Sequence, residues 1–298
     1  MLRQYLTLFR LPNVFTAPSN ILAGYYTVVE PANASGLHLA ILIICSILLY
    51  LSGIVLNDYF DIEVDRRERP LRPLPAGTVS KRKVLLIGIV FIIAANFISL
   101  LVSTSTFIIA AILSGTIVSY DYRMKYSVYG PGMMGAARAL NVMLGSSPIF
   151  LTTVLNTNNS ARIAVVTVSL FLFVFAISRL SRKEIDETDK VRTAKGSFLM
   201  IFAVLAIIIV SGLVGVFLKD LFANLALFAI IMIITFKPLL QRQPLSSKDI
   251  QRTIKTMVLS IIVLDSAFVS GSAGTAYGLV TLMLIMPAII LSRKFYVT

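Results

Sequence analysis

Residues 39–65 read LAILIICSILLYLSGIVLNDYFDIEVD, and their pattern decides the fold class. From Leu39 to Leu56 there is no charged side chain, whereas four acids follow within residues 57–65. A helix needs about 20 mostly apolar residues to cross the hydrocarbon core of a bilayer. The stretch therefore predicts a transmembrane helix that delivers an acidic cluster to one membrane face.

Comparable apolar segments recur along the whole chain, in which 57% of residues are hydrophobic and only 14% are charged. A soluble domain carries about 25% charged residues. Bare backbone polar groups cannot face lipid, and a barrel would show short alternating strands instead. We therefore predict an all-α polytopic membrane bundle of about ten transmembrane helices, forming a single domain over residues 1–298. The segments run approximately over 15–31, 38–57, 83–103, 105–120, 131–152, 162–180, 196–218, 220–237, 254–270 and 273–292.

The distribution of basic residues predicts the topology. Nearly all of the 27 Lys and Arg residues lie at the termini or in the loops after the second, fourth, sixth and eighth segments; Arg138, Arg162 and Lys219 are the exceptions. Basic loops stay on the cytoplasmic side. We expect a multi-pass protein of a bacterial or archaeal plasma membrane, with both termini and the acidic motifs cytoplasmic. The net charge of +13 then follows from topology and contacts with membrane lipid, and no nucleic-acid partner is predicted.

Asn57, Asp61 and Asp65 are spaced i, i+4 and i+8, so a helix would place them on one face. Three oxygen-bearing side chains on one stripe suit Mg²⁺, which prefers oxygen ligands and often joins carboxylates to the phosphates of a substrate. A solvated loop of mixed charges is the alternative. It fits each acid singly but does not account for the whole string.

Two basic elements accompany the stripe. The loop RRERPLRPLPAG at residues 66–77 is rich in proline, and it could hold Arg72 over a bound diphosphate, since the guanidinium fork matches phosphate oxygens. Lys125, in the string YDYRMK at residues 120–125, could neutralise a departing diphosphate. The alternative for Lys125 is ordinary positive charge in a cytoplasmic loop.

A second acidic group, Glu184, Asp186, Glu187 and Asp189, follows the sixth segment on the same predicted face. Two facing clusters could hold Mg²⁺ ions with a diphosphate between them. A solvated loop is again the alternative.

Polar residues also lie inside predicted spans. Arg138 and Asn141 are three residues apart in the fifth segment and share a helix face, and Asp265 lies in the ninth. Charges at this depth are costly and are usually paired or functional. Arg138 could pair with an acid of the cytoplasmic clusters. Asp265 could pair with Arg138 or face a water-filled cavity.

These strings resemble the UbiA superfamily of intramembrane prenyltransferases, over essentially the whole chain. The motif from Asn57 to Asp65 and the residues from Arg69 to Gly77 are the most specific part. The resemblance implies transfer of a prenyl group from an allylic diphosphate to an acceptor, with Mg²⁺ as cofactor. It implies that Asn57, Asp61 and Asp65 form the first metal-diphosphate site, and that Arg72 and Lys125 contact the diphosphate. We assign Asp61, Asp65 and Lys125 as catalytic, and Arg138 and Asn141 as further substrate-binding residues.

Within the superfamily the chain looks most like the UbiA-like EboC group, through residues 11–17, 178–184, 264–267 and 293–298 and through a tenth helix beyond the usual nine. The second motif departs from the family pattern. KEIDETD at residues 183–189 is shorter by one residue and has Glu184 where Asp is expected. We carry over Glu184, Glu187 and Asp189 as metal ligands, with Asp186 as a substitute for Glu187.

The function predicted is Mg²⁺-assisted prenyl transfer to an unidentified lipid or aromatic acceptor. The alternative is a non-catalytic or transport-associated protein that binds a prenylated or phosphorylated lipid, which the altered second motif favours. A secondary transporter would show internal repeats and broken helices at mid-membrane. The sequence shows no convincing repeat, and its acidic clusters lie at helix ends.

Overall fold

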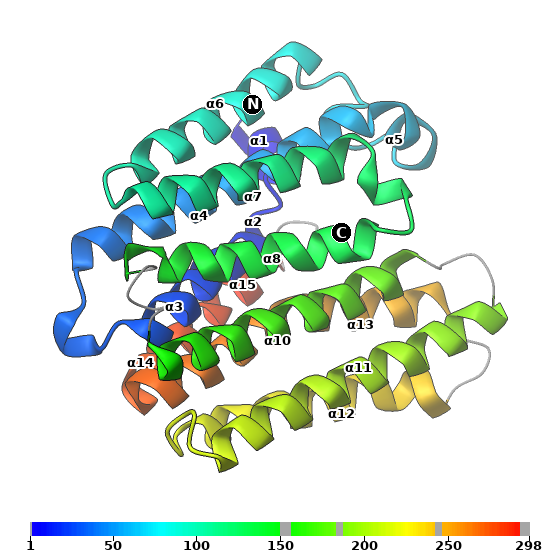
Figure 1. Cartoon of the computed structure of the whole chain (residues 1–298). Helices are drawn as coiled ribbons and strands as arrows, with labels where there is room; N and C mark the ends of the chain where they lie inside the picture. Colours follow the sequence, from blue (N-terminus) through cyan, green and yellow to red (C-terminus); the bar gives the residue numbers. More distant parts are fainter. Residues whose placement is uncertain (1, 150–155, 183–186, 242–245, 293–298) are drawn as a thin grey trace.

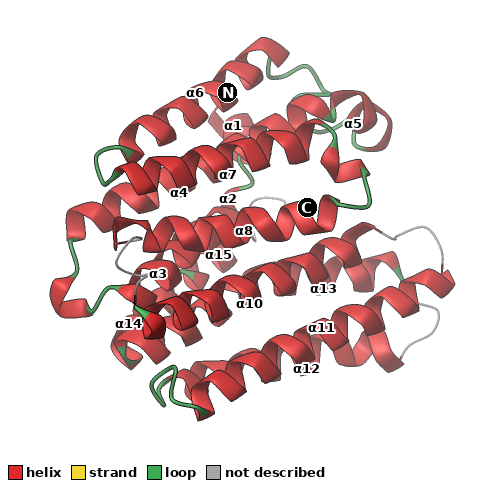
Figure 2. Ribbon diagram, in the orientation of Figure 1, coloured by secondary structure: helices red, strands yellow, loops and turns green. Residues whose placement is uncertain are grey.

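The computed structural model describes residues 2–149, 156–182, 187–241 and 246–292, and this part of the chain is helical without a strand (Figures 1 and 2). A helix lies in each segment predicted to cross the membrane. The helices are α3 (Thr16–Val28), α4 (Gly36–Phe60), α6 (Lys81–Ser99), α7 (Thr104–Tyr122), α8 (Gly130–Ser146), α10 (Thr157–Arg182), α11 (Glu187–Leu213), α12 (Leu221–Gln241), α13 (Ser247–Ala273), α14 (Thr275–Met283) and α15 (Ile285–Ser292).

Within the described residues, eight helical spans are long and apolar enough to cross a membrane, with α14 and α15 together forming one of them. The other two predicted segments correspond to α3, of 13 residues, and α8, of 17 residues, which fall short of that length. The all-α polytopic membrane bundle is therefore confirmed. The number ten and the single-domain boundary stay predictions.

Two helices from opposite ends of the chain form the centre of the bundle. Helix α3 packs against α4, α8, α10 and α13, and most of its residues are buried. In the apolar 18-residue stretch of α13, 72% is buried inside the bundle, against 22% in the corresponding stretch of α6. Large apolar side chains such as Phe97, Leu199 and Ile234 are exposed on the outer helices, as a surface facing lipid requires.

Helices α3 and α8 cross with their backbones in contact. A Cβ atom at Gly24 would overlap the carbonyl oxygen of Val142, and one at Gly145 would lie 2.5 Å from the carbonyl oxygen of Ile21. Small residues at a crossing allow this approach between membrane helices. The crossing lets the side chains of α8 reach the backbone of α3, as the 3.1 Å hydrogen bond from Asn141 Nδ2 to the Ala17 carbonyl shows.

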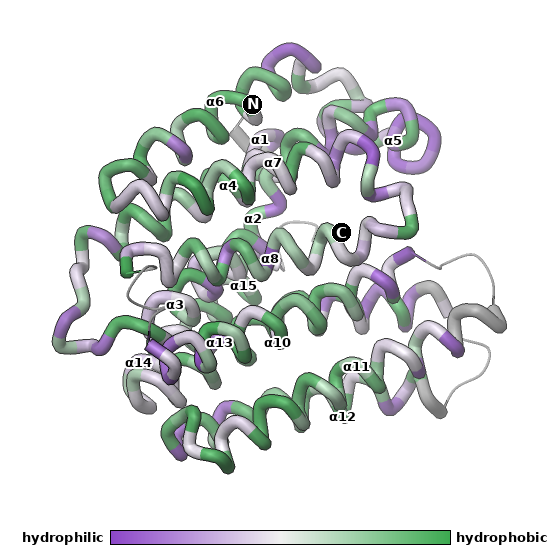
Figure 3. The backbone as a smooth tube through the Cα atoms, viewed as in Figure 1, coloured by the Kyte–Doolittle hydropathy of each residue, from purple (hydrophilic) through white to green (hydrophobic). Residues whose placement is uncertain are grey.

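The alternating direction of the helices brings the C-terminal ends of α4, α7 and α10 to one end of the bundle (Figure 1). The short helices α5 (Ile62–Glu68) and η2 (Met124–Tyr126) lie at the same end. Figure 3 shows that hydrophilic residues are densest there, around α5, whereas the helix bodies are mainly hydrophobic. The predicted motifs therefore meet at one end of an apolar bundle.

Candidate functional site

A cavity of about 1000 Å³ opens among α3, α4, α7, α8, α10, α13 and the loop after α5. Asn57 and Asp121 line its charged end, and Leu49 and Leu113 line it eight residues earlier on α4 and α7. Eight residues correspond to roughly 12 Å of helix. The cavity therefore has a polar mouth at the helix ends and an apolar depth inside the bundle, a shape that suits an amphiphile with an anionic head.

The acidic stripe keeps helical register across the junction between α4 and α5. The backbone N–H of Asp61 donates to the Asn57 carbonyl at 2.9 Å, and that of Asp65 donates to the Asp61 carbonyl at 2.8 Å. Asn57, Asp61 and Asp65 therefore follow one another at helical spacing, as the sequence predicts. Their side chains nevertheless have three different sets of partners.

Asp61 binds the loop that follows α7. Lys125 Nζ lies 2.6 Å from Asp61 Oδ1, and the Tyr126 hydroxyl donates a hydrogen bond to the same oxygen. Partial desolvation, followed by the hydrogen bond and negative charge of Asp61, raises the pKa of the largely exposed Tyr126 above its usual value. Tyr126 therefore stays a neutral donor at physiological pH. The structure brings Lys125 to the first motif, and Tyr126 is a contact that the sequence analysis missed.

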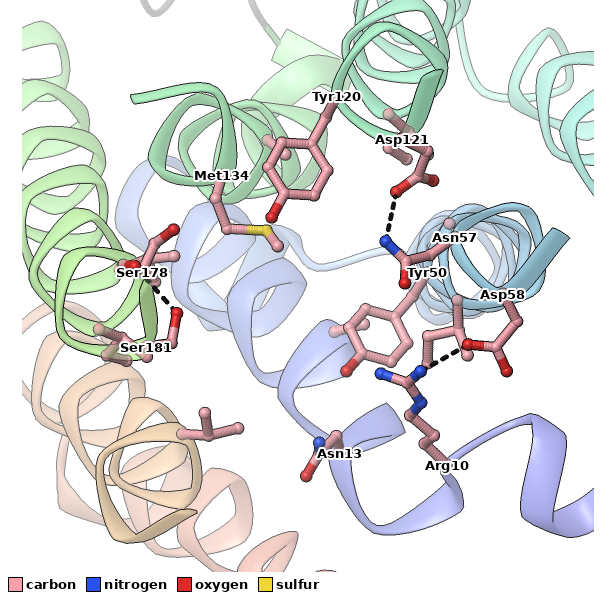
Figure 4. A pocket seen from close by; sticks show the side chains of 18 of the residues that line it. Arg10, Asn13, Tyr50, Asn57, Asp58, Tyr120, Asp121, Met134, Ser178 and Ser181 are labelled. Atoms are coloured by element: carbon pink, nitrogen blue, oxygen red, sulfur yellow. Dashed lines mark hydrogen bonds and ion pairs between the residues drawn. The ribbon is translucent and has the colours of Figure 1, made fainter. Parts of the chain in front are cut away.

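Two arginines form ion pairs with the other two aspartates of the motif, Asp58 and Asp65. Arg72 Nη1 lies 2.7 Å from Asp65 Oδ2 and 3.5 Å from Asp58 Oδ1, so the proline-rich loop folds back over α5. Arg10 Nη2 lies 2.6 Å from Asp58 Oδ1 (Figure 4). Sequence reasoning missed both Arg10 and Asp58, although Asp58 is the second residue of the motif.

Arg10 lies between α1 (Leu2–Leu8) and α2 (Leu11–Val14) in the left-handed conformation, with φ of 44°. A non-glycine residue in this region costs free energy and persists only where surrounding contacts hold it. The contact with Asp58 is one such interaction, and it directs a cation of the N-terminal segment into the mouth of the cavity.

Asn57 turns toward α7 rather than toward the other motif residues. Its Nδ2 donates to Asp121 Oδ1 at 3.1 Å, and both side chains line the cavity (Figure 4). Asp121 lies in the string that the sequence analysis singled out for Lys125, but it received no role there. Its position at the end of an apolar helix was the available signal.

The predicted metal ligands do not form a preformed cluster among the described residues. In the described residues, no three His, Cys, Asp or Glu side chains gather closely enough to hold a metal ion. Asp58, Asp61 and Asp65 are each paired with Arg or Lys. Glu184 and Asp186 lie outside the described residues, and so do the side chains of Glu187 and Asp189 at the start of α11. The metal-binding roles of both motifs stay predictions.

Arg138 and Asn141 line the cavity from α8. Arg138 donates to Thr16 Oγ1 at 2.9 Å and to Asn20 Oδ1 at 3.0 Å, and its guanidinium lies 5.1 Å from the centre of the Tyr50 ring. Asn141 accepts from the Ser46 hydroxyl at 2.8 Å. Within the described part of the chain Arg138 forms no ion pair with the acids of the first motif. The side chains of the second acidic group lie outside the described residues, so pairing with that group stays a prediction.

Asp265 on α13 is fully buried and accepts hydrogen bonds from Ser19 at 2.6 Å and from Asn20 Nδ2 at 2.8 Å. Asn20 therefore bridges Asp265 and Arg138, since its Oδ1 accepts from Arg138. Of the two alternatives left open for Asp265, the structure is nearer to pairing with Arg138, but the link is indirect and runs through Asn20. An amide can serve as the bridge because it donates to the carboxylate and accepts from the guanidinium.

Arg182 at the end of α10 fixes the loop that carries Lys125. Its Nη1 donates to the Ser127 carbonyl, and its guanidinium passes over Gly130, the first residue of α8. A Cβ atom at Gly130 would overlap Arg182 Nη2 and lie 2.8 Å from the Met124 carbonyl oxygen. The absence of a side chain at Gly130 is therefore a condition for this loop geometry.

Gly130→Ala is expected to displace the Lys125 loop and lower turnover by about tenfold to a hundredfold, because small misplacements near a reaction centre have effects of that size. The bundle should remain folded. Gly132→Ala is the matched control, since a Cβ atom there meets no atom within 4 Å. Kinetics of both variants in detergent would check this, and equal turnover would contradict the role given to the loop.

These features define a class: a polytopic membrane bundle whose cavity joins an apolar interior to a mouth of acids, arginines and a lysine. The model of the UbiA prenyltransferase family matches residues 17–244, and the chain belongs to that family. The superfamily predicted from the sequence is thus confirmed, whereas the EboC subgroup stays a prediction.

Relatives and solved structures agree with this placement. A digeranylgeranylglyceryl phosphate synthase of Saccharolobus solfataricus is 26% identical over 151 residues, covering 50% of this chain and 53% of the relative. One of Methanothrix thermoacetophila is 33% identical over 121 residues, covering 40% and 45%. The alignments thus span about half of these relatives. A UbiA homologue of Aeropyrum pernix K1 has 13% identity and a TM-score of 0.68, over 94% of this chain and 98% of that one.

A UbiA homologue from Archaeoglobus fulgidus, solved bound to GPP and Mg²⁺, has 14% identity and a TM-score of 0.65, over 94% of this chain and 99% of that one. At such identities the likeness shows the fold alone. The common fold agrees with the all-helical membrane bundle described above.

Proposed function

We propose that this protein is an intramembrane prenyltransferase that moves a prenyl group from an allylic diphosphate to a lipid or aromatic acceptor, with Mg²⁺ as cofactor. The observation that carries the proposal is the cavity, because it places charged groups at its mouth directly above an apolar interior. An allylic diphosphate has the same division between an anionic head and a hydrocarbon tail.

The residues present fit a Mg²⁺ ion. Asn57, Asp61 and Asp65 supply amide and carboxylate oxygens at helical spacing, and one buried oxygen of the neighbouring Asp121 has no hydrogen-bond partner among the described residues. When bound, the metal stabilises negative charge on the diphosphate as its carbon–oxygen bond breaks. This role is the reason for assigning Asp61 and Asp65 to catalysis.

The basic side chains at the mouth would bind phosphate oxygens. Arg10, Arg72 and Lys125 each contact an acid of the first motif, so a diphosphate that approaches these acids also approaches three cations. Tyr126 adds a neutral hydroxyl donor. Cations fixed where negative charge develops stabilise the transition state for departure of the diphosphate.

The deep part of the cavity would hold the prenyl chain. Leu49, Leu113, Ile117 and Val258 line it and contribute no group that could attack a carbocation. Water excluded from this region cannot capture the allylic cation. Arg138 and Asn141 line the cavity from α8 at the depth of Tyr50 and Ser46, where they would orient the acceptor.

The relatives are named as digeranylgeranylglyceryl phosphate synthases, which makes a prenylated glyceryl phosphate the first acceptor to test. The test is release of pyrophosphate by the purified protein, with geranylgeranyl diphosphate, Mg²⁺ and a pool of lipid and aromatic acceptors. We expect release that requires both Mg²⁺ and an acceptor, and a product whose mass identifies that acceptor. Diphosphate binding without release, across a range of donors, would contradict an enzyme and favour the lipid-carrier alternative.

We also propose that both termini and the acidic motifs lie on the cytoplasmic side of the plasma membrane. The distribution of Lys and Arg supports this orientation. Labelling of a cysteine introduced at exposed Ser246 by a reagent that cannot cross the membrane should fail in intact cells and succeed in opened ones. Labelling in intact cells would reverse the orientation.

A further inference from the structure

Asp121 differs from the other acids at the mouth of the cavity. Asp121 is only 3% exposed, and it lines the cavity near the end of α7. Oδ1 accepts the hydrogen bond from Asn57, whereas Oδ2 is buried without a hydrogen-bond partner among the described residues. In contrast, Asp58, Asp61 and Asp65 each form an ion pair with Arg or Lys.

We propose that Asp121 is a further ligand of the divalent cation that accompanies the diphosphate. This inference rests on the proposed function, and it adds a ligand from α7 to those supplied by the two acidic segments. The ion takes oxygen ligands, and one or two protein carboxylates normally suffice because phosphate oxygens and water complete the coordination.

The burial of Asp121 argues for a missing cationic partner. A buried carboxylate oxygen without a donor is costly, so such groups are rare unless a ligand or water satisfies them. The nearest ammonium, that of Lys125, is in contact with Asp61. Asp121 interacts electrostatically with both of these groups, which places it within the same charged cluster. A divalent cation between Asp121 and Asp61 would relieve their repulsion.

The hydrogen bond between Asn57 and Asp121 also orients the amide. Because Nδ2 donates to Asp121, Oδ1 of Asn57 points away from that carboxylate (Figure 4). An amide binds a metal through its oxygen, so this orientation is the one that a ligand role for Asn57 requires. Asp121 would therefore act twice, through Oδ2 on the metal and through Oδ1 on the neighbouring ligand.

Asp121 is held from two helices. It belongs to α7, and its Oδ1 accepts from Asn57 on α4, so its position does not depend on the second acidic segment.

The test is direct binding of Mn²⁺, followed by its electron paramagnetic resonance signal, to the full-length protein in detergent with a non-cleavable geranylgeranyl thiolodiphosphate. Asp121→Asn should weaken Mn²⁺ affinity by about tenfold to a hundredfold, the loss typical of removing a group that supports a metal site. The substituted amide oxygen can still accept from Asn57, so the variant removes the charge and spares that contact. Asp121→Glu restores a carboxylate and should bind Mn²⁺ more tightly than Asp121→Asn.

Asp220→Asn is the matched control, because Asp220 binds Thr275 at the opposite end of the bundle and should leave Mn²⁺ affinity unchanged. If wild type, Asp121→Asn and Asp121→Glu bind Mn²⁺ with equal affinity while wild type is active, this inference is wrong and the proposed function still stands. A wild type that neither binds Mn²⁺ nor releases pyrophosphate would overturn both. If Asp121→Asn does not fold, Asp121→Ser decides: a loss of Mn²⁺ affinity supports the ligand role, and unaltered affinity overturns it.

Discussion

Asp61→Ala is expected to reduce prenyl transfer by at least about a hundredfold, the size of effect seen when a group that stabilises transition-state charge is removed. Asp61 is the centre of the predicted metal stripe and also holds Lys125 and Tyr126. Its loss therefore removes a proposed metal ligand and releases two groups proposed to face the diphosphate. The measurement is the rate of pyrophosphate release per mole of purified protein in detergent, compared between the variant and wild type.

Glu63→Ala is the matched control for that experiment. Glu63 belongs to the same acidic string, but its side chain is 72% exposed and pairs with Arg66 on the surface of α5. Exposed pairs of this kind contribute little to stability. Both variants should elute and melt like wild type. Full activity of Asp61→Ala would remove the basis of the metal assignment, and equal loss in Glu63→Ala would point to general damage of the loop.

The second large effect is expected from Asp265→Ala, which should destabilise the bundle by about 3–5 kcal/mol, as for other buried ionic networks that lose one partner. Ser19 and Asn20 lose their common acceptor, and Arg138 loses the buried carboxylate to which Asn20 links it. The loss lies at the centre of the bundle, where α3, α8 and α13 meet. Thermal unfolding followed by size-exclusion chromatography would measure it.

A double variant separates the ionic part of this effect from simple loss of packing. Combining Asp265→Ala with Arg138→Leu should cost less than the sum of the two single changes, because no unpaired charge remains. Asp249→Asn, at a partly exposed position in the first turn of α13, keeps an oxygen that can accept from the Ser246 hydroxyl and should change the melting temperature little. Strict additivity of the single variants would show that Asp265 and Arg138 do not act together.

Local sequence patterns were sufficient to predict the helices and the helical alignment of the first acidic motif. Apolar runs predicted the membrane bundle because lipid leaves few other structures for the backbone. The spacing of Asn57, Asp61 and Asp65 predicted their helical alignment, and the structure retains it even though α4 ends at Phe60. The brevity of α3 was not predicted, since its flanking residues are also apolar and only the tertiary packing shows where the helix begins.

The partners of the site residues could not be found in the same way. Arg10 and Asp58 are 48 residues apart, and Asn57 and Asp121 are 64 apart, so no local periodicity connects them. The bridge through Asn20 needs the close crossing of α3 and α8. For such pairs the sequence identifies charged residues at helix ends, whereas the order of helices around the cavity decides which of them meet.

The pairing of acids with cations at the mouth has a thermodynamic consequence. A metal ion bound as proposed would require Asp61 and Asp65 to loosen their contacts with Lys125 and Arg72. Those cations would then become available to phosphate oxygens, so occupation of the carboxylates would prepare the binding groups for the diphosphate. Linkage makes this preparation reciprocal: a bound diphosphate would draw the cations away and raise the metal affinity of the acids by the same factor. The mouth of the cavity would thus behave as an ion exchanger in which the two ligands strengthen one another.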